Sequence, residues 1–125
     1  MRILSTYIHG MLDYVVGVAL IMAPNIFGFS ELGGPAVLLP RVLGTAAILV
    51  SLLTNYEWGV LKVIPMRVHL VVDFLSGALL AASPWLFGFS HEPSNAWAPH
   101  VVVGLMEILV VVMSQTEPRR NLKHA

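Results

Sequence analysis

The chain has no cysteine and very little charge. The absence of cysteine from its 125 residues excludes disulfides and thiolate metal sites. Charged residues make up 11% of the chain, less than half of the roughly 25% typical of soluble domains. The formal net charge is zero, which argues against nucleic acid as a partner. This composition excludes an ordinary water-facing surface.

Four long apolar blocks take the place of the missing charge. They span residues 3–23, 36–53, 63–82 and 99–113, and each approaches the length of about 20 residues that crosses a bilayer. The second and fourth blocks are short unless the loop residues before them join in. The first block carries His9 and Asp13 in its middle, so it is not a cleavable signal peptide. We therefore expect an all-α membrane protein with four transmembrane helices, surrounded by the lipid bilayer.

The positive charges predict an orientation for these helices. Four crossings place both chain ends and the central loop on one side of the membrane, and the opposite loops contain only Arg41. The remaining cations all fall on the first side, at Arg2, Lys62, Arg67, Arg119, Arg120 and Lys123. The positive-inside rule then predicts a multi-pass protein of the cell (inner) membrane with both termini in the cytoplasm.

The sequence repeats itself at an offset of 60 residues. The run Phe27-Gly28-Phe29-Ser30 returns unchanged at positions 87–90. Further matched pairs are His9 and His69, Asp13 and Asp73, Gly17 and Gly77, Leu20 and Leu80, Pro24 and Pro84, and Gly44 and Gly104. A repeat of this length indicates one duplicated structural unit. We predict two tandem helical hairpins, residues 1–60 and 61–125, the second ending in a short cytoplasmic tail. Both hairpins would have the same orientation, as in parallel repeats.

Proline and aromatic residues mark the first turn of each unit. Pro24 and Pro84 cannot continue the helical hydrogen-bond ladder, so both helices are predicted to stop or kink there. Pro40 and Pro99 suit the first turn of the returning helices. We interpret the turn as an interfacial anchor. Its residues are Pro24, Phe27, Gly28 and Phe29 in the first unit, and Ser83, Pro84, Trp85, Phe87, Gly88 and Phe89 in the second.

The tripeptide Ser83-Pro84-Trp85, inside a unit of two transmembrane helices, resembles the SPW-repeat family of small bacterial integral membrane proteins. The first unit reads Ala23-Pro24-Asn25 and keeps only the proline. Any role for the tryptophan ring is therefore in question there. The resemblance covers nearly the whole chain, and it implies an integral membrane protein with four helices. It brings no established activity with it.

The candidate site is a set of ionisable residues inside the apolar blocks. His9 and Asp13 are four residues apart and share one helix face, as do His69 and Asp73. Glu107 has no acidic counterpart at the matching position. Each carboxylate at membrane depth costs about 2.5–3.5 kcal/mol on insertion scales, so these groups need compensating partners. We expect all five residues to form one polar cluster near the midplane of the bundle.

Two classes of function use this cluster. In the first, its contacts join helices, and the protein is of structural or interaction type with no assigned biochemical activity. Its partners would then be a second copy or another membrane protein. In the alternative, the cluster handles protons or a metal ion, because His/Asp/Glu chains form proton relays and bind zinc or iron. A histidine pair can also ligate haem b from opposite sides.

No cofactor is predicted as the first choice, and the nature of any metal is open. We predict no enzymatic activity and no catalytic residue, because no nucleophile has an obvious base and orienting group. Arg41 and His100 match across the repeats if one loop residue is gapped. Both are expected at outer helix starts, where they would pair with Glu31 or Glu92, or contact lipid headgroups.

Overall fold

The computed structural model describes residues 2–117 and contains four long helices. They are α1 (Thr6–Ile26), α2 (Gly34–Leu53), α3 (Met66–Leu86) and α4 (Ser94–Met113), with a short 3-10 turn, η1 (Ser30–Leu32), after α1. All four are long and apolar enough to cross a membrane, which confirms the predicted all-α architecture. The residues before positions 36 and 99 do join α2 and α4. The predicted cytoplasmic tail after residue 117 lies outside the described residues.

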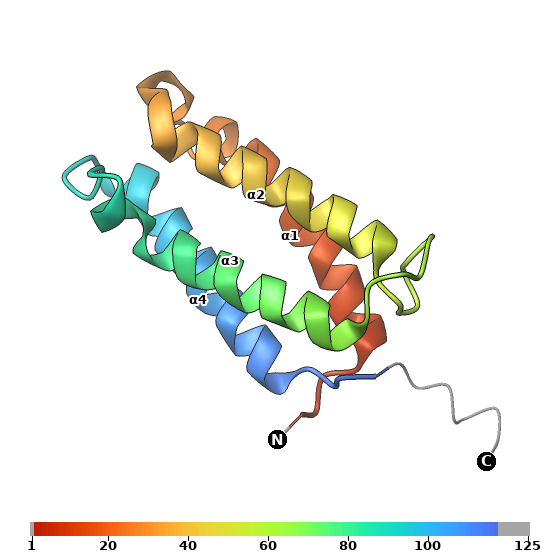
Figure 1. Ribbon diagram of the computed structural model, residues 1–125. Helices are drawn as coiled ribbons and strands as arrows, with labels where there is room; N and C mark the ends of the chain where they lie inside the picture. Colours follow the sequence, from red (N-terminus) through yellow and green to blue (C-terminus); the bar gives the residue numbers. More distant parts are fainter. Residues whose placement is uncertain (1, 118–125) are drawn as a thin grey trace, which may run out of the picture.

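The helices form two hairpins with the same orientation (Figure 1). The first hairpin is α1 with α2, and the second is α3 with α4. The turns at residues 27–33 and 87–93 share one end of the bundle, here called the loop end (Figure 1). The first described residues, the linker at 54–65 and residues 114–117 share the opposite end, here called the terminal end (Figure 1).

Glycines bring the two helices of each hairpin into backbone contact. A Cβ added at Gly44 on α2 would lie 2.5 Å from the carbonyl oxygen of Gly17 on α1. A Cβ added at Gly104 on α4 would lie 2.6 Å from the carbonyl oxygen of Gly77 on α3. Small residues permit this close approach, which provides van der Waals contact where no hydrophobic force drives association. The matched glycines thus pack helices within a hairpin and not between hairpins.

Short backbone bridges connect the two hairpins at the terminal end. Leu4, just before α1, pairs with Ser114, just after α4. Ile64, just before α3, pairs with Thr54, just after α2. Each position in the first bridge differs by 60 from its counterpart in the second, so the two bridges are repeat equivalents. The start and the end of the described chain are therefore joined in the same way as the two sides of the central linker.

Two of the four prolines are located differently from the prediction. Pro24 and Pro84 lie near the ends of their helices, as expected, and the helices continue past them to Ile26 and Leu86. Pro40 and Pro99 lie inside α2 and α4, which begin at Gly34 and Ser94, and not in their first turns. Proline keeps a helical φ, but its ring crowds the carbonyl four residues earlier and gives it no N–H donor, so a helix continues through proline where that carbonyl is accommodated. That carbonyl can take another donor: the Ser83 hydroxyl donates to the oxygen of Leu80, 2.7 Å away, in place of Pro84.

Large apolar side chains cover the outside of the helices. Val15, Leu49, Leu75 and Leu105, one from each helix, are 56–61% exposed. A surface of this kind suits hydrocarbon chains, while the helical backbone satisfies its own polar groups. The structure is therefore that of a multi-pass membrane protein.

Candidate functional site

Four side chains from α1 and α3 meet at the terminal end of the bundle. They are His9, Asp13, His69 and Asp73, called the quartet below. His9 Nε2 lies 3.1 Å from Asp13 Oδ1 and 2.9 Å from Asp73 Oδ2. His69 Nε2 lies 2.9 Å from Asp13 Oδ2 and 3.0 Å from Asp73 Oδ2. Each imidazole thus contacts the carboxylate of its own helix and that of the other hairpin.

The quartet is enclosed by protein. The His9 and His69 side chains are 0% and 1% exposed, while those of Asp13 and Asp73 are 12% and 13% exposed. The imidazole rings lie edge to face, with centroids 5.3 Å apart. Charges enclosed in this way must be paired and hydrogen-bonded, because burying an isolated charge is very costly. The two crossed pairs provide this compensation.

A hydroxyl group from the other hairpin contacts the Nδ1 atom of each histidine. Ser114 Oγ donates to the oxygen of Val110 and lies 2.5 Å from His9 Nδ1. Thr54 Oγ1 donates to the oxygen of Val50 and lies 2.7 Å from His69 Nδ1.

A hydroxyl has one hydrogen to donate, and here the carbonyl oxygen receives it. Each hydroxyl oxygen therefore accepts from the imidazole, so Nδ1 of both rings carries a hydrogen. The two Nε2 atoms are left facing the carboxylates of Asp13 and Asp73.

The linker completes one side of the quartet. The hydroxyl of Tyr56 donates to Asp13 Oδ2, 2.7 Å away, and its side chain is 1% exposed. Burial, and then the negative charge of Asp13, raises the pKa of this phenol above its ordinary value of 10.0. The position equivalent to Tyr56 in the second unit is Thr116, so the quartet is asymmetric in its outer contacts.

Glu107 lies beside the quartet and not within it. With Asp13 and Asp73 it lines a small cavity of about 40 Å³, and its buried Oε1 atom has no hydrogen-bond partner.

The depth of the quartet follows from its place along α1 and α3. His9 and His69 are the fourth residues of these helices, and Asp13 and Asp73 are the eighth residues, in helices of 21 residues. The quartet therefore lies between the terminal end and the middle of the two helices.

His100 is buried near the loop end, whereas it was expected to pair with an acid or to contact lipid headgroups. It is 2% exposed. Its Nε2 lies 2.9 Å from the oxygen of Ala36, and its Nδ1 lies 2.7 Å from that of Ala96. Pro40 has no N–H for the Ala36 oxygen four residues earlier, so His100 takes the place of that donor. Arg41, expected to pair with an acid, instead donates to Asn25 Oδ1, 2.8 Å away.

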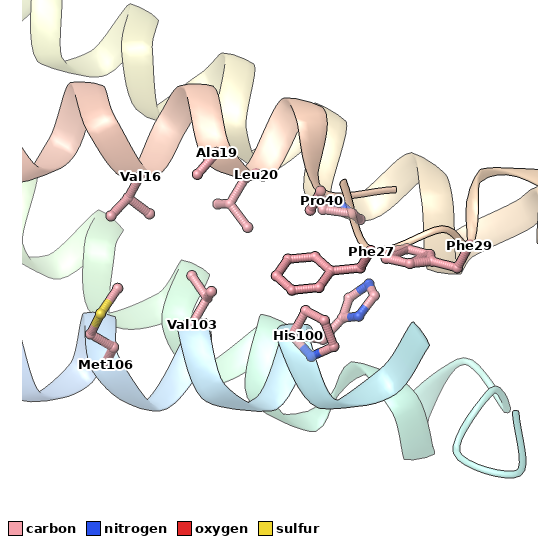
Figure 2. Close-up of a pocket in the computed structure, with 11 residues that line it drawn as sticks. Val16, Ala19, Leu20, Phe27, Phe29, Pro40, His100, Val103 and Met106 are labelled. Carbon is pink, nitrogen blue, oxygen red and sulfur yellow. The ribbon is translucent and has the colours of Figure 1, made fainter. Parts of the chain in front are cut away.

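The phenylalanines of the repeated turn enclose His100. Its ring lies 5.6 Å from that of Phe29 and 4.7 Å from that of Phe89, between centroids. Figure 2 shows His100 and Phe29 at one end of a cavity of about 150 Å³ between α1 and α4. The other lining residues are almost all apolar, and Val16, Val103 and Met106 lie further along it (Figure 2). In each turn one phenylalanine, Phe29 or Phe89, is thus a core residue, whereas Phe27 and Phe87 are 49% and 46% exposed.

Three residues of the site were missed by sequence reasoning. Thr54 and Ser114 are hydroxyl residues related by the 60-residue offset, and that match was the signal that could have identified them. Tyr56 has no equivalent in the second unit, so the repeat gave no such signal.

Four membrane-spanning helices, paired in two like-oriented hairpins around a buried polar quartet, define a class: a small multi-pass α-helical membrane protein. A family model described as the SPW repeat domain matches residues 7–114. The chain therefore belongs to the SPW repeat family, as the resemblance of its Ser83-Pro84-Trp85 tripeptide indicated. Comparison with curated proteins gives no match, and neither does comparison with solved structures.

Proposed function

We propose that this chain is a structural membrane protein in which the quartet joins the two hairpins between α1 and α3, in addition to the backbone bridges at the terminal end. One observation carries the proposal: His9 contacts Asp73 at 2.9 Å, and His69 contacts Asp13 at 2.9 Å. Both contacts cross from one hairpin to the other, whereas glycine contacts pack each hairpin internally. Removing them would leave the hairpins joined by the backbone bridges, by the contact of His100 with Ala36 and by apolar packing, without the polar contacts that join α1 to α3 within lipid.

The charges of the quartet support this role. In the protein without a bound metal ion, a hydrogen on Nε2 as well as on Nδ1 would make each imidazole a cation. Two cations would then face two carboxylates, and the cluster would be neutral. Charge-assisted hydrogen bonds of this kind are roughly twice as strong as neutral ones. The reciprocal pattern also defines the register, since a one-turn slip of either hairpin would separate both crossed pairs.

We further propose the inner membrane of a bacterial cell as its location, with the terminal end in the cytoplasm. Arg2, Lys62 and Arg67 all lie at or next to the terminal end, and the positive-inside rule assigns such an end to the cytoplasm. Arg2 also donates to the oxygen of Ser114, 2.6 Å away, so this cation is part of the fold. A reporter fused after residue 125 that is active only in the periplasm should stay silent.

The joining role is tested by replacing each aspartate of the quartet with asparagine. An amide keeps the shape but not the charge, so Asp13→Asn and Asp73→Asn should each lower the free energy of unfolding by about 1–3 kcal/mol. Unfolding would be followed by tryptophan fluorescence as SDS is titrated into protein held in a mild detergent.

Glu107→Gln is the matched control. It changes a carboxylate beside the same cavity whose Oε1 atom has no partner, so its stability should be unchanged or higher. Equal losses in all three variants would contradict the proposal, because they would assign the effect to carboxylates in general and not to the crossed pairs.

A further inference from the structure

We propose that the quartet binds one divalent transition-metal ion of the zinc type. The proposal goes beyond the joining role. It rests on the donor atoms and their second partners, and its test can fail while the joining role holds.

The first support is the donor set. His9 and His69 offer imidazole nitrogen, and Asp13 and Asp73 offer carboxylate oxygen, with the four donor atoms all within 4.8 Å of one another. Two imidazoles and two carboxylates are ligands that zinc takes in tetrahedral sites, at about 2.0–2.2 Å from the ion. Donors at those distances stand about 3.3 Å apart. The four imidazole–carboxylate contacts of 2.9–3.1 Å would open by a few tenths of an ångström, and the wider separations, up to 4.8 Å, would close around the ion.

The second support is the orientation of the imidazoles. A metal-bound histidine usually donates its other ring N–H to a fixed acceptor, which orients the ring and selects the tautomer. Here Ser114 Oγ and Thr54 Oγ1 are those acceptors for the two Nδ1 hydrogens. Both hydroxyls donate their own hydrogen to backbone carbonyls. The second shell of a metal site is therefore built for both rings, and Nε2 is the free donor in each case.

The third support is the Nε2 atom of His69. Its Nε2 is buried and makes no aligned hydrogen bond, although two carboxylate oxygens lie at 2.9 and 3.0 Å. A ring in a closed ion-pair cluster should direct its N–H at one of these oxygens, as His9 does toward Asp73. A ring that presents a lone pair to an ion among the donors has no such requirement. His69 Nε2 has the geometry of the second case.

The composition of the site also selects the kind of ion. Two imidazoles disfavour calcium and magnesium, which prefer oxygen ligands. Haem does not suit the site, since Asp13 and Asp73 contact both Nε2 atoms and a porphyrin would have to displace them. Two carboxylates balance the two charges of the ion, and the Nε2 hydrogens of the joined state leave to solvent. Four protein ligands indicate a closed, structural site and not an open catalytic one.

The test uses the full-length protein, purified without a histidine tag, stripped with a chelator and then dialysed against zinc. We expect one zinc ion per chain by elemental analysis. Loading with cobalt(II) should give the visible absorption bands of a tetrahedral site. His69→Gln and Asp73→Asn should abolish both signals. Ser114→Ala and Thr54→Val remove the ring acceptors and should weaken zinc binding by about tenfold to a hundredfold.

Two control variants keep the test specific. His100→Gln changes a buried histidine outside the quartet, and His91→Gln changes an exposed one, 76% exposed on its side chain; both should still bind one ion. Circular dichroism would show that each variant is folded. Absence of zinc from the folded wild-type protein would overturn the proposal, as would unchanged uptake in Asp73→Asn. If the folded wild-type protein binds no zinc but Asp73→Asn is destabilised, the joining role of the quartet holds.

Discussion

The terminal end and the loop end of the bundle connect the hairpins in different ways. At the terminal end, the quartet supplies two residues from each hairpin, and its contacts repeat under the 60-residue offset. Near the loop end, Asn95 donates to the oxygen of Phe27, 2.7 Å away, and His100 contacts the oxygens of Ala36 and Ala96. These two alanines are themselves repeat equivalents. The terminal end is thus joined by two copies of the same contact, and the loop end by single contacts that are not repeated at the 60-residue offset.

The difference shows how the two copies of a duplicated sequence can diverge while the contacts between their hairpins are kept. The helices α2 (34–53) and α4 (94–113) correspond at an offset of 60 without a gap, so the gapped match of Arg41 with His100 is wrong. Position 40 carries proline and its equivalent, position 100, carries histidine, so the two copies have become complementary. The proline leaves the Ala36 oxygen without its helical donor, and the histidine of the other copy donates to it. The quartet has kept both copies alike, since a crossed pair needs an imidazole and a carboxylate from each hairpin.

The largest effect should come from removing one member of the quartet. His69→Leu leaves both carboxylates enclosed with a single imidazole, and should cost about 3–5 kcal/mol of unfolding free energy. Replacing all four members with leucine should cost far less than four times that amount, because a well-packed apolar cluster often equals a buried ion-pair network. Both values come from SDS titration in detergent. Additive losses would show that the quartet acts as four independent residues.

A smaller effect is expected at the loop end. His100→Leu leaves the buried Ala36 oxygen without a donor and should cost about 1–3 kcal/mol. Pro40→Ala restores a backbone N–H in α2 that can donate to that oxygen. In the Pro40→Ala background, His100→Leu should therefore cost less, by about 1 kcal/mol. A double-mutant cycle of unfolding free energies measures this coupling. Zero coupling would mean that His100 serves only to fill space between the phenylalanines.

The smallest effect concerns the asymmetry of the quartet. Tyr56→Phe removes one hydrogen bond to Asp13 and should cost about 0.5–1.5 kcal/mol. Because burial raises the pKa of Tyr56 above 10.0, its contribution is complete below that pH and is lost as pH rises toward the folded-state value. Wild-type stability should therefore fall above about pH 10 more steeply than that of Tyr56→Phe. Parallel pH profiles would contradict this assignment.

The residues that are repeated at an offset of 60 predicted much of the fold. Composition indicated four membrane helices, and the match of His9 with His69 and of Asp13 with Asp73 indicated that one face is shared by both units. These inferences hold because hydrophobic length and helical spacing are local properties of the chain. The tripeptide Ser83-Pro84-Trp85 led to the correct family for the same reason.

The contacts between the hairpins were beyond prediction from local pattern. Nothing in the spacing of His100 shows that it donates to Ala36, because that contact joins residues 64 apart. The ends of the helices were also beyond such prediction, because helix boundaries depend on how proline is accommodated, as the passage of α1 through Pro24 shows. The hydroxyls of Thr54 and Ser114 resembled ordinary helix-end residues until tertiary structure brought them to the imidazoles.

The bridge between Leu4 and Ser114 has a consequence for chain connectivity. It repeats the bridge between Ile64 and Thr54, so the two hairpins meet in the same way on both sides. On one side they are joined by the covalent linker, and on the other side the chain is not continuous. Cutting the chain near residue 60 and joining its two original ends should preserve the same set of contacts, as circular permutation does at exposed sites. Each hairpin holds one imidazole, one carboxylate and one hydroxyl of the paired arrangement. A single hairpin of about 60 residues thus carries half of every crossed contact, and two copies of it could assemble the quartet about a true twofold axis.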